Sequence, residues 1–218
     1  MAYPTVSAPY GLKPVNLIGG QVYAGSTRLI PIASGYNTNI FYGDVVKLAS
    51  SGTIQKDAGT TTVASNGVAG IFVGCVYTNP STKQPTWAQY WPAGTVASDA
   101  QAYVVDDPDV LFKVAAVSSG TTVAFYGQTV IGNNVALVQN SGSTNTGDSA
   151  VAIDGTSAAA TASLPIRIVA GVPDTANASG EFCEFICKFN APYITLTEGT
   201  PNVVAWNGGH MYNNPTGV

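Results

Sequence analysis

Charged side chains are scarce in this sequence. Only 9% of the 218 residues are Asp, Glu, Lys or Arg, whereas typical soluble domains carry about 25%. This profile fits an all-β protein with many turns, or a component of a larger assembly whose surface is covered by neighbours. The eight Lys and Arg residues are scattered and the formal net charge is −4. Because no basic stripe is present to neutralise a phosphate backbone, we expect no nucleic-acid partner.

Long apolar runs and secretion signals are also lacking. No apolar run approaches the roughly 20 residues that span a bilayer, so we expect no membrane partner. The first residues, MAYPTVSAPYGLKPV, lack the charged-then-apolar order of a signal peptide. We therefore expect a soluble product made in a cytoplasm. Three cysteines, an odd number, argue against a disulfide framework in such a protein.

Groups suited to catalysis are few. The chain has one histidine, His210, in a final stretch interrupted by Pro and Asn, and it has no G-x-S-x-G nucleophile elbow. A Ser/His/Asp or Cys/His site would have to recruit this histidine. We expect no enzymatic activity and no cofactor. A small β-rich enzyme remains one alternative, and activity that survives His210→Ala would be needed to support it.

Two clusters of possible metal ligands are better explained structurally. Cys183, Cys187 and His210 are zinc-ligand types, but residues four apart on a strand lie roughly 13 Å apart. We predict that the cysteines are buried as small apolar side chains. The carboxylates at 106–109 (DDPD) lack the ligand spacing of a calcium loop and are typical of a solvated acidic turn. We expect no metal site.

The residues that are abundant indicate β structure. Residues 41–79 contain two apolar segments, YGDVVKL and VAGIFVGCVY, with a Gly- and Ser-rich connection that could hold a short strand at GTIQK. Their β-branched residues favour a pleated, half-buried surface, and glycines mark the turns. No helix is indicated. We predict an all-β fold, a β-sandwich or β-barrel of jelly-roll or tulip-like type, with extended N- and C-terminal arms.

Further strands are predicted later in the chain. Two apolar strands flank the acidic turn at 106–109. In EFCEFICKF (181–189) the alternation places Cys183, Phe185, Cys187 and Phe189 on one face of a strand, with Glu184 and Lys188 on the other.

The chain divides into three regions by composition. Residues 1–25 contain three prolines and read as an extended N-terminal arm. Residues 26–190 form the β core, which is divisible into two β subdomains that would meet near 113–120. Residues 191–218 form a C-terminal tail that we expect to be ordered only if something holds it.

The aromatic cluster formed by Trp87, Tyr90 and Trp91 has three interpretations. These side chains could pack in the core under a loop, anchor a protein interface, or form a platform on which a carbohydrate stacks. Trp and Tyr are enriched both in cores and at interfaces. The sequence leaves the three interpretations open.

Several segments, taken in order, resemble a known family. They are APYGLKPV, FYGDVVKL, VAGIFVGCVY, QYWPAGT and YVVDDPDVLFKV. The chain resembles the capsid decoration, or cement, proteins of tailed bacteriophages from marine and freshwater habitats. The resemblance runs from about Ala8 to Phe189, and its most specific parts are YWPAG and VVDDPDVLF. It does not extend to the tail that begins at Ala191.

The resemblance implies a function. Such proteins are β-sandwiches or β-barrels that bind the exterior of an HK97-fold capsid and clamp adjacent major capsid protein subunits against internal pressure. They have no catalytic residues and associate with themselves, so we expect a trimer first and a dimer as the alternative. The implied location is the outer surface of the virion, after assembly in the host cytoplasm.

The expected contacts lie in the arm, the aromatic cluster and the tail. The candidate interface residues are Tyr3, Pro9, Tyr10, Leu12, Trp87, Tyr90, Trp91, Trp206 and Tyr212. The alternative function is that of another virion β component, a tail or spike subunit with a carbohydrate-binding role. Glycan binding that is lost on Trp87→Ala or Trp91→Ala would favour that alternative.

Overall fold

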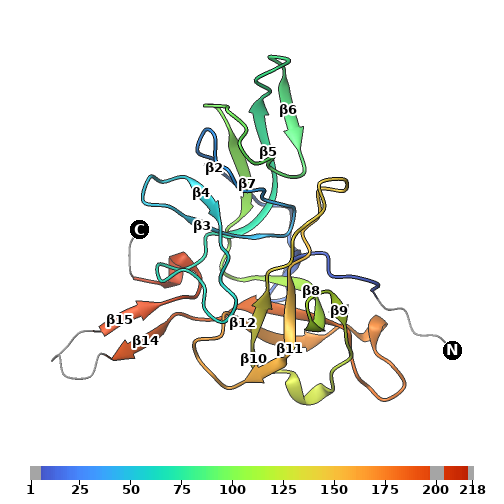
Figure 1. Cartoon of the computed structure of the whole chain (residues 1–218). Helices are drawn as coiled ribbons and strands as arrows, with labels where there is room; N and C mark the ends of the chain where they lie inside the picture. Colours follow the sequence, from blue (N-terminus) through green and yellow to red (C-terminus); the bar gives the residue numbers. More distant parts are fainter. Residues whose placement is uncertain (1–5, 197–203, 216–218) are drawn as a thin grey trace.

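The structure is a computed structural model that describes residues 6–196 and 204–215 (Figure 1). Within these ranges the chain forms β-strands, three short 3-10 helices and no α-helix. The all-β prediction is confirmed. The 3-10 helices are η1 (Gln128–Val130), η2 (Pro173–Thr175) and η3 (Met211–Asn213).

Five strands close into a mixed barrel. They pair in the order β8-β11-β10-β12-β13, and β13 pairs back with β8. The β8–β11 pair is parallel, while the other pairs in this ring are antiparallel. Two further strands, β1 and β9, also pair with β8. The strands of this sheet are β1 (Lys13–Leu17), β8 (Val110–Ser119), β9 (Thr122–Val123), β10 (Asn134–Val138), β11 (Ala152–Ala159), β12 (Ile166–Gly171) and β13 (Glu184–Phe189).

A second, antiparallel sheet is formed by the chain between β1 and β8. Its order is β2-β7-β5-β3-β4, and β6 pairs with the C-terminal end of β5. In Figure 1 the β5, β6 and β7 strands extend away from the barrel, toward the top of the view. The strands are β2 (Arg28–Pro31), β3 (Val45–Leu48), β4 (Ile54–Lys56), β5 (Gly70–Thr78), β6 (Pro85–Ala88) and β7 (Gln101–Val105). The short strand expected at GTIQK is thus present as β4.

Apolar side chains fill both units. One buried cluster fills the barrel and continues into the second sheet through Val45, Val68 and Ile71. The other lies within the second sheet around Phe72 and Trp91. Because the first cluster contains residues of both sheets, the barrel and the second sheet share buried apolar surface.

The alternation predicted for residues 183–189 is confirmed. Cys183, Phe185 and Cys187 are fully buried, and the cysteines are free thiols. Glu184 points to the other face, but it is also buried, at 3% exposure. Its carboxylate accepts a hydrogen bond from the Tyr10 hydroxyl and lies 3.6 Å from Lys113 Nζ. The sequence pattern gave the face of Glu184 but not its burial, because a segment distant in the sequence covers it.

The acidic turn carries the chain from one sheet to the other. β7 ends at Val105 in the second sheet, and β8 begins at Val110 in the barrel. Within the turn, Asp107 Oδ1 accepts a hydrogen bond of 2.8 Å from the Asp109 amide. The two predicted strands are present but belong to different sheets. The crossing therefore lies at 106–109, whereas we expected two β units to meet near 113–120.

The described part of the expected N-terminal arm is integrated into the body. β1 pairs with β8, and Leu12 is fully buried. The Gly11 amide donates to the Val151 carbonyl at 3.1 Å. Gly11 has φ +81°, and a Cβ there would lie 2.7 Å from the Ser149 Cβ, so only glycine fits this crossing. Residues 6–17 are therefore an outer part of the barrel and not a free arm.

The described part of the expected tail is held by the chain itself. β14 (Tyr193–Leu196) and β15 (Val204–Asn207) form a hairpin. The segment that follows, residues 208–215, is called the C-terminal segment below. It runs parallel to the chain at Val68 through an isolated bridge at His210. Asn214 Nδ2 also donates to the Ser65 carbonyl at 2.8 Å. Contacts within the chain therefore hold this segment.

Candidate partner-binding surface

The structure separates the nine predicted interface residues by exposure. Three are buried within the chain: Pro9, Leu12 and Trp91. Three are partly buried: Tyr10, Tyr90 and Trp206. Two are exposed: Trp87 and Tyr212. Tyr3 lies outside the described residues. The buried residues do not present a surface to a partner in this conformation, which corrects their place in the predicted interface.

The aromatic cluster is split between core and surface. Trp91 is fully buried, its indole Nε1 donates to the Tyr36 carbonyl at 3.1 Å, and its ring meets the edge of Tyr77. Trp87 lies on β6 opposite Val76 and is 71% exposed. The two tryptophans therefore do not form one flat platform, so a carbohydrate could not stack across both of them.

The outward face of the second sheet carries two apolar cross-strand pairs, together with the polar Gln101 opposite Val76. Residues directly opposite each other on paired strands share a face. Leu29 on β2 lies opposite Tyr103 on β7, and Val76 on β5 lies opposite Trp87 on β6. These four residues are called the apolar face below. Leu29 and Trp87 are 52% and 71% exposed. No member carries a charge, so the apolar face is suited to a partner that is itself weakly charged.

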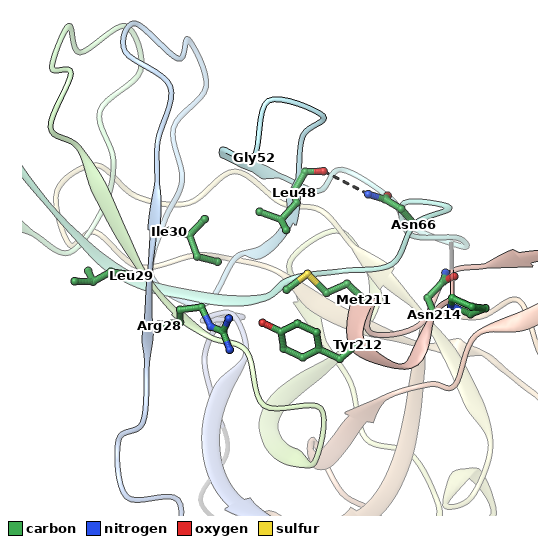
Figure 2. Close-up of a pocket in the computed structure, with 10 residues that line it drawn as sticks. Arg28, Leu29, Ile30, Leu48, Gly52, Asn66, Met211, Tyr212 and Asn214 are labelled. Atoms are coloured by element: carbon green, nitrogen blue, oxygen red, sulfur yellow. Dashed lines mark hydrogen bonds between the residues drawn. The ribbon is translucent and has the colours of Figure 1, made fainter. Parts of the chain in front are cut away.

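A groove adjoins the apolar face, where the second sheet is open between β2 and the β3–β4 hairpin. It encloses about 490 Å³ and is also lined by the C-terminal segment. Figure 2 shows Ile30, Leu48 and Met211 pointing toward one another across the groove, with Leu29 pointing away from it. The sequence did not identify this groove.

One end of the groove is closed by a neutral polar cluster. Arg28 Nε lies 2.6 Å from Asp106 Oδ2, and its guanidinium lies 5.4 Å from the centre of the Tyr212 ring. The Tyr212 hydroxyl donates to Asp106 at 2.8 Å. Burial and this hydrogen bond raise the pKa of Tyr212 to about 12. Because Arg28 is paired with Asp106, the groove offers no unpaired charge to a ligand.

The single histidine lies under this cluster and is not in a mobile tail. His210 is 2% exposed, and its Nδ1 accepts from the Tyr212 amide at 3.4 Å. Its Nε2 has no hydrogen-bond partner among the described residues. Burial lowers the pKa of His210 to about 4. The ring is therefore a neutral core group at neutral pH.

No metal or membrane-spanning feature is present in the described ranges. Within residues 6–196 and 204–215, no three His, Cys, Asp or Glu side chains gather closely enough to hold a metal ion. Burial raises the pKa of the Cys75 thiol to about 12 and that of Cys187 further. The same part of the chain contains no helix long and apolar enough to cross a bilayer.

Comparisons with known proteins return no relative. No protein-family model, no curated protein and no solved structure matches this chain. A functional assignment must therefore come from the surfaces described above and from the resemblance in the sequence.

Proposed function

We propose that this chain is a structural virion protein that binds the exterior of an HK97-fold phage capsid and bridges adjacent major capsid protein subunits. The observation that carries the proposal is the apolar face, on the part of the second sheet that extends away from the barrel (Figure 1). The ordered resemblance of residues 8–189 to capsid decoration proteins supports it. Under this proposal the fold is a variant of the jelly-roll or tulip-like domains expected for such proteins.

The apolar face offers a substantial contact through one side chain. A tryptophan buries about 200 Å², and Trp87 is 71% exposed. Covering this exposed part would remove about 140 Å² from water and contribute ~3–4 kcal/mol at about 25 cal/mol per Å². This energy is modest for one contact. Many copies on one capsid, and self-association into a trimer or a dimer, would raise the total through avidity.

The low charge of the chain agrees with this assignment. Only 9% of residues are charged, and four of the described ion pairs join groups from distant parts of the chain, as in Lys13–Asp148 and Lys188–Asp109. Such internal pairing leaves a weakly charged surface, which favours burial against neighbours. The proposed location is the capsid exterior, reached in the host cytoplasm.

The proposal is tested by adding purified protein to phage heads that lack it. We expect occupancy of the heads at a stoichiometry comparable to the major capsid protein, visible by cryogenic imaging. Trp87→Ala should reduce occupancy, whereas the matched control Val22→Ala, which removes an equally exposed apolar side chain outside the apolar face, should not. Failure of the unaltered protein to bind heads would overturn the function. Normal occupancy with Trp87→Ala would overturn the role of the apolar face.

A further inference from the structure

The strand β6 forms an open edge of the second sheet. It pairs with β5 on one side, and no strand of the described residues pairs with its other side. In Figure 1, β6 lies at the margin of the strands that extend away from the barrel. Pro85, Trp87 and Gln89, which alternate along this edge, are all exposed. A second strand can therefore approach β6 from solvent.

The hydrogen bonds between β5 and β6 show which backbone groups face the open edge. The Asn79 amide donates to the Gln84 carbonyl at 2.9 Å at the start of this hairpin. In an antiparallel pair, every second residue exchanges hydrogen bonds with the neighbouring strand. The residues of β6 that bond to β5 are therefore Thr86 and Ala88.

The remaining polar groups of β6 point away from β5. The N–H and C=O of one trans peptide point in opposite directions. Because Thr86 and Ala88 bond to β5, the outward groups are the Trp87 N–H and C=O, the Pro85 C=O and the Gln89 N–H. None of these groups forms a hydrogen bond with any other part of the described chain. The edge thus presents donors and acceptors to solvent.

This edge has little protection against pairing. Natural proteins protect edge strands with charged side chains, bulges or proline. Residues 84–89 (QPTWAQ) carry no charge, and the nearest cation, Lys83, precedes the strand. Pro85 removes one N–H but keeps its outward C=O. The position of Trp87 is open and also carries an apolar side chain that is 71% exposed.

Pro85 selects one register for pairing between two copies of the chain. Two identical edges can pair antiparallel about a two-fold axis. With Trp87 opposite itself, each Trp87 amide donates to the Trp87 carbonyl of the other copy, and each Gln89 amide donates to the Pro85 carbonyl of the other copy. All the outward groups then have partners. With Trp87 opposite Pro85, the Trp87 carbonyl has no donor, because proline lacks an N–H.

The same register joins the apolar faces of the two copies. The two-fold axis of such a pair is perpendicular to the sheet, so both copies present the same face on the same side. The two Trp87 side chains would lie next to each other as a cross-strand aromatic pair, with Cα atoms about 5.5 Å apart. Trp87 also lies opposite Val76 within its own chain. Pairing therefore produces one apolar surface that continues across the axis.

We propose that this chain forms a two-fold dimer through antiparallel pairing of β6 with β6 of a second copy, centred on Trp87. The proposal rests on the self-association that the proposed function includes, and it specifies a dimer and its contact. It does not depend on binding to a capsid. The contact is short, so the dimer is weak in solution, and two joined apolar faces would bind a capsid with higher avidity than one.

The test is sedimentation of the purified full chain from about 10 μM to about 1 mM. We expect the mass to rise from that of a monomer toward that of a dimer, with a Kd at or below about 1 mM. Trp87→Lys and Trp87→Glu each place like charges opposite each other across the axis and should weaken dimerisation by about tenfold or more. Val96→Lys changes a 67% exposed residue outside β6 and, as the matched control, should dimerise normally.

Mixing the two charged variants tests whether residue 87 lies opposite itself. An equimolar mixture of Trp87→Lys and Trp87→Glu should dimerise more tightly than either variant alone, because opposite charges then face each other. Amide hydrogen exchange in the unaltered chain tests the backbone pairing. The Trp87 and Gln89 amides should exchange more slowly at about 1 mM than at about 10 μM, whereas the Val96 amide should not change.

Several results would overturn the dimer. These are a monomer at every concentration, a trimer, equal dimerisation by Trp87→Lys, a mixture no tighter than its components, or exchange at Trp87 that does not depend on concentration. Binding to phage heads separates this proposal from the proposed function. A protein that dimerises as described but leaves heads unoccupied would overturn only the capsid function. A monomer that occupies heads would overturn only the dimer.

Discussion

Acidification should release the C-terminal segment through the titration of His210. This imidazole is 2% exposed, and burial lowers its pKa from 6.5 to about 4. The charges of Asp106 and Asp107 and the Ala69 backbone favour the protonated form, while Lys188 opposes it. The effect of burial on the pKa of His210 is larger than that of the groups that favour the protonated ring. Protonating the ring would place a charge that Asp106 and Asp107 compensate only in part between the C-terminal segment and the chain at Val68.

The linkage between proton binding and folding gives the sign and size of the change in stability with pH. The folded pKa lies below the unfolded value, so the unfolded state binds the proton more tightly and stability falls as pH decreases from 6.5 to 4. The shift of about 2.5 pKa units corresponds to ~3 kcal/mol at about 1.36 kcal/mol per unit. That is a large share of the roughly 5–15 kcal/mol that stabilises a domain. The first event should be release of residues 208–215, which removes the Tyr212–Asp106 hydrogen bond.

The chain has one histidine, so its imidazole resonance can be followed by NMR without assignment. We expect a midpoint near pH 4, together with loss of amide protection in the C-terminal segment. The free energy of unfolding measured in urea should fall between pH 6.5 and 4 in the unaltered chain. It should fall less in His210→Leu. The comparison of the unaltered chain with His210→Leu is needed because another group also titrates on folding. Burial raises the pKa of Asp57, so this group makes folding more favourable as pH falls. A midpoint near 6.5, or equal pH dependence in both proteins, would refute the reasoning.

Three further predictions concern stability. Trp91→Ala should lower the free energy of unfolding by about 3–5 kcal/mol because it empties a fully buried site. Trp87→Ala should change the free energy of unfolding by about 0.5 kcal/mol or less. Similar urea midpoints for the two variants would contradict the division of the aromatic cluster between core and surface. Gly11→Ala should cost about 1–3 kcal/mol through its positive φ and close contacts, and thermal unfolding unchanged from the parent would disprove this. Deleting residues 1–15 should lower the melting temperature, since it removes Leu12 from the core and part of β1; an unaltered melting curve would show instead that the segment is a dispensable arm.

The sequence did not show which of the predicted interface residues are exposed, and the two tryptophans show why. Trp87 and Trp91 are four residues apart, a spacing that would place both on one face of a continuous strand. The strand β6 ends at Ala88, however, and the chain turns so that Trp91 pairs with Ile40. The composition of the cluster indicated both core and interface. Because β6 ends between the two tryptophans, Trp87 stays exposed on the strand and Trp91 enters the core.

The groove could not be predicted from local patterns. It joins β2 to the C-terminal segment. Its lining consists of common residue types at unremarkable local spacing. This arrangement exists only after the C-terminal segment has docked beside the second sheet, so no window of the sequence carries a signal for it.

The sequence by itself determined the all-β class, the strands around the acidic turn, and the buried face of Cys183, Phe185 and Cys187. These features are local, because the alternation of side chains along a strand has a period of two whatever the strand pairs with. Tertiary structure decided which strands pair. β8 contacts β1 and β13, which lie about a hundred residues before and seventy after it in the chain. That closure buried Leu12 and Glu184, and docking of the C-terminal segment buried His210, because burial depends on distant segments that cover a residue and not on its neighbours in sequence.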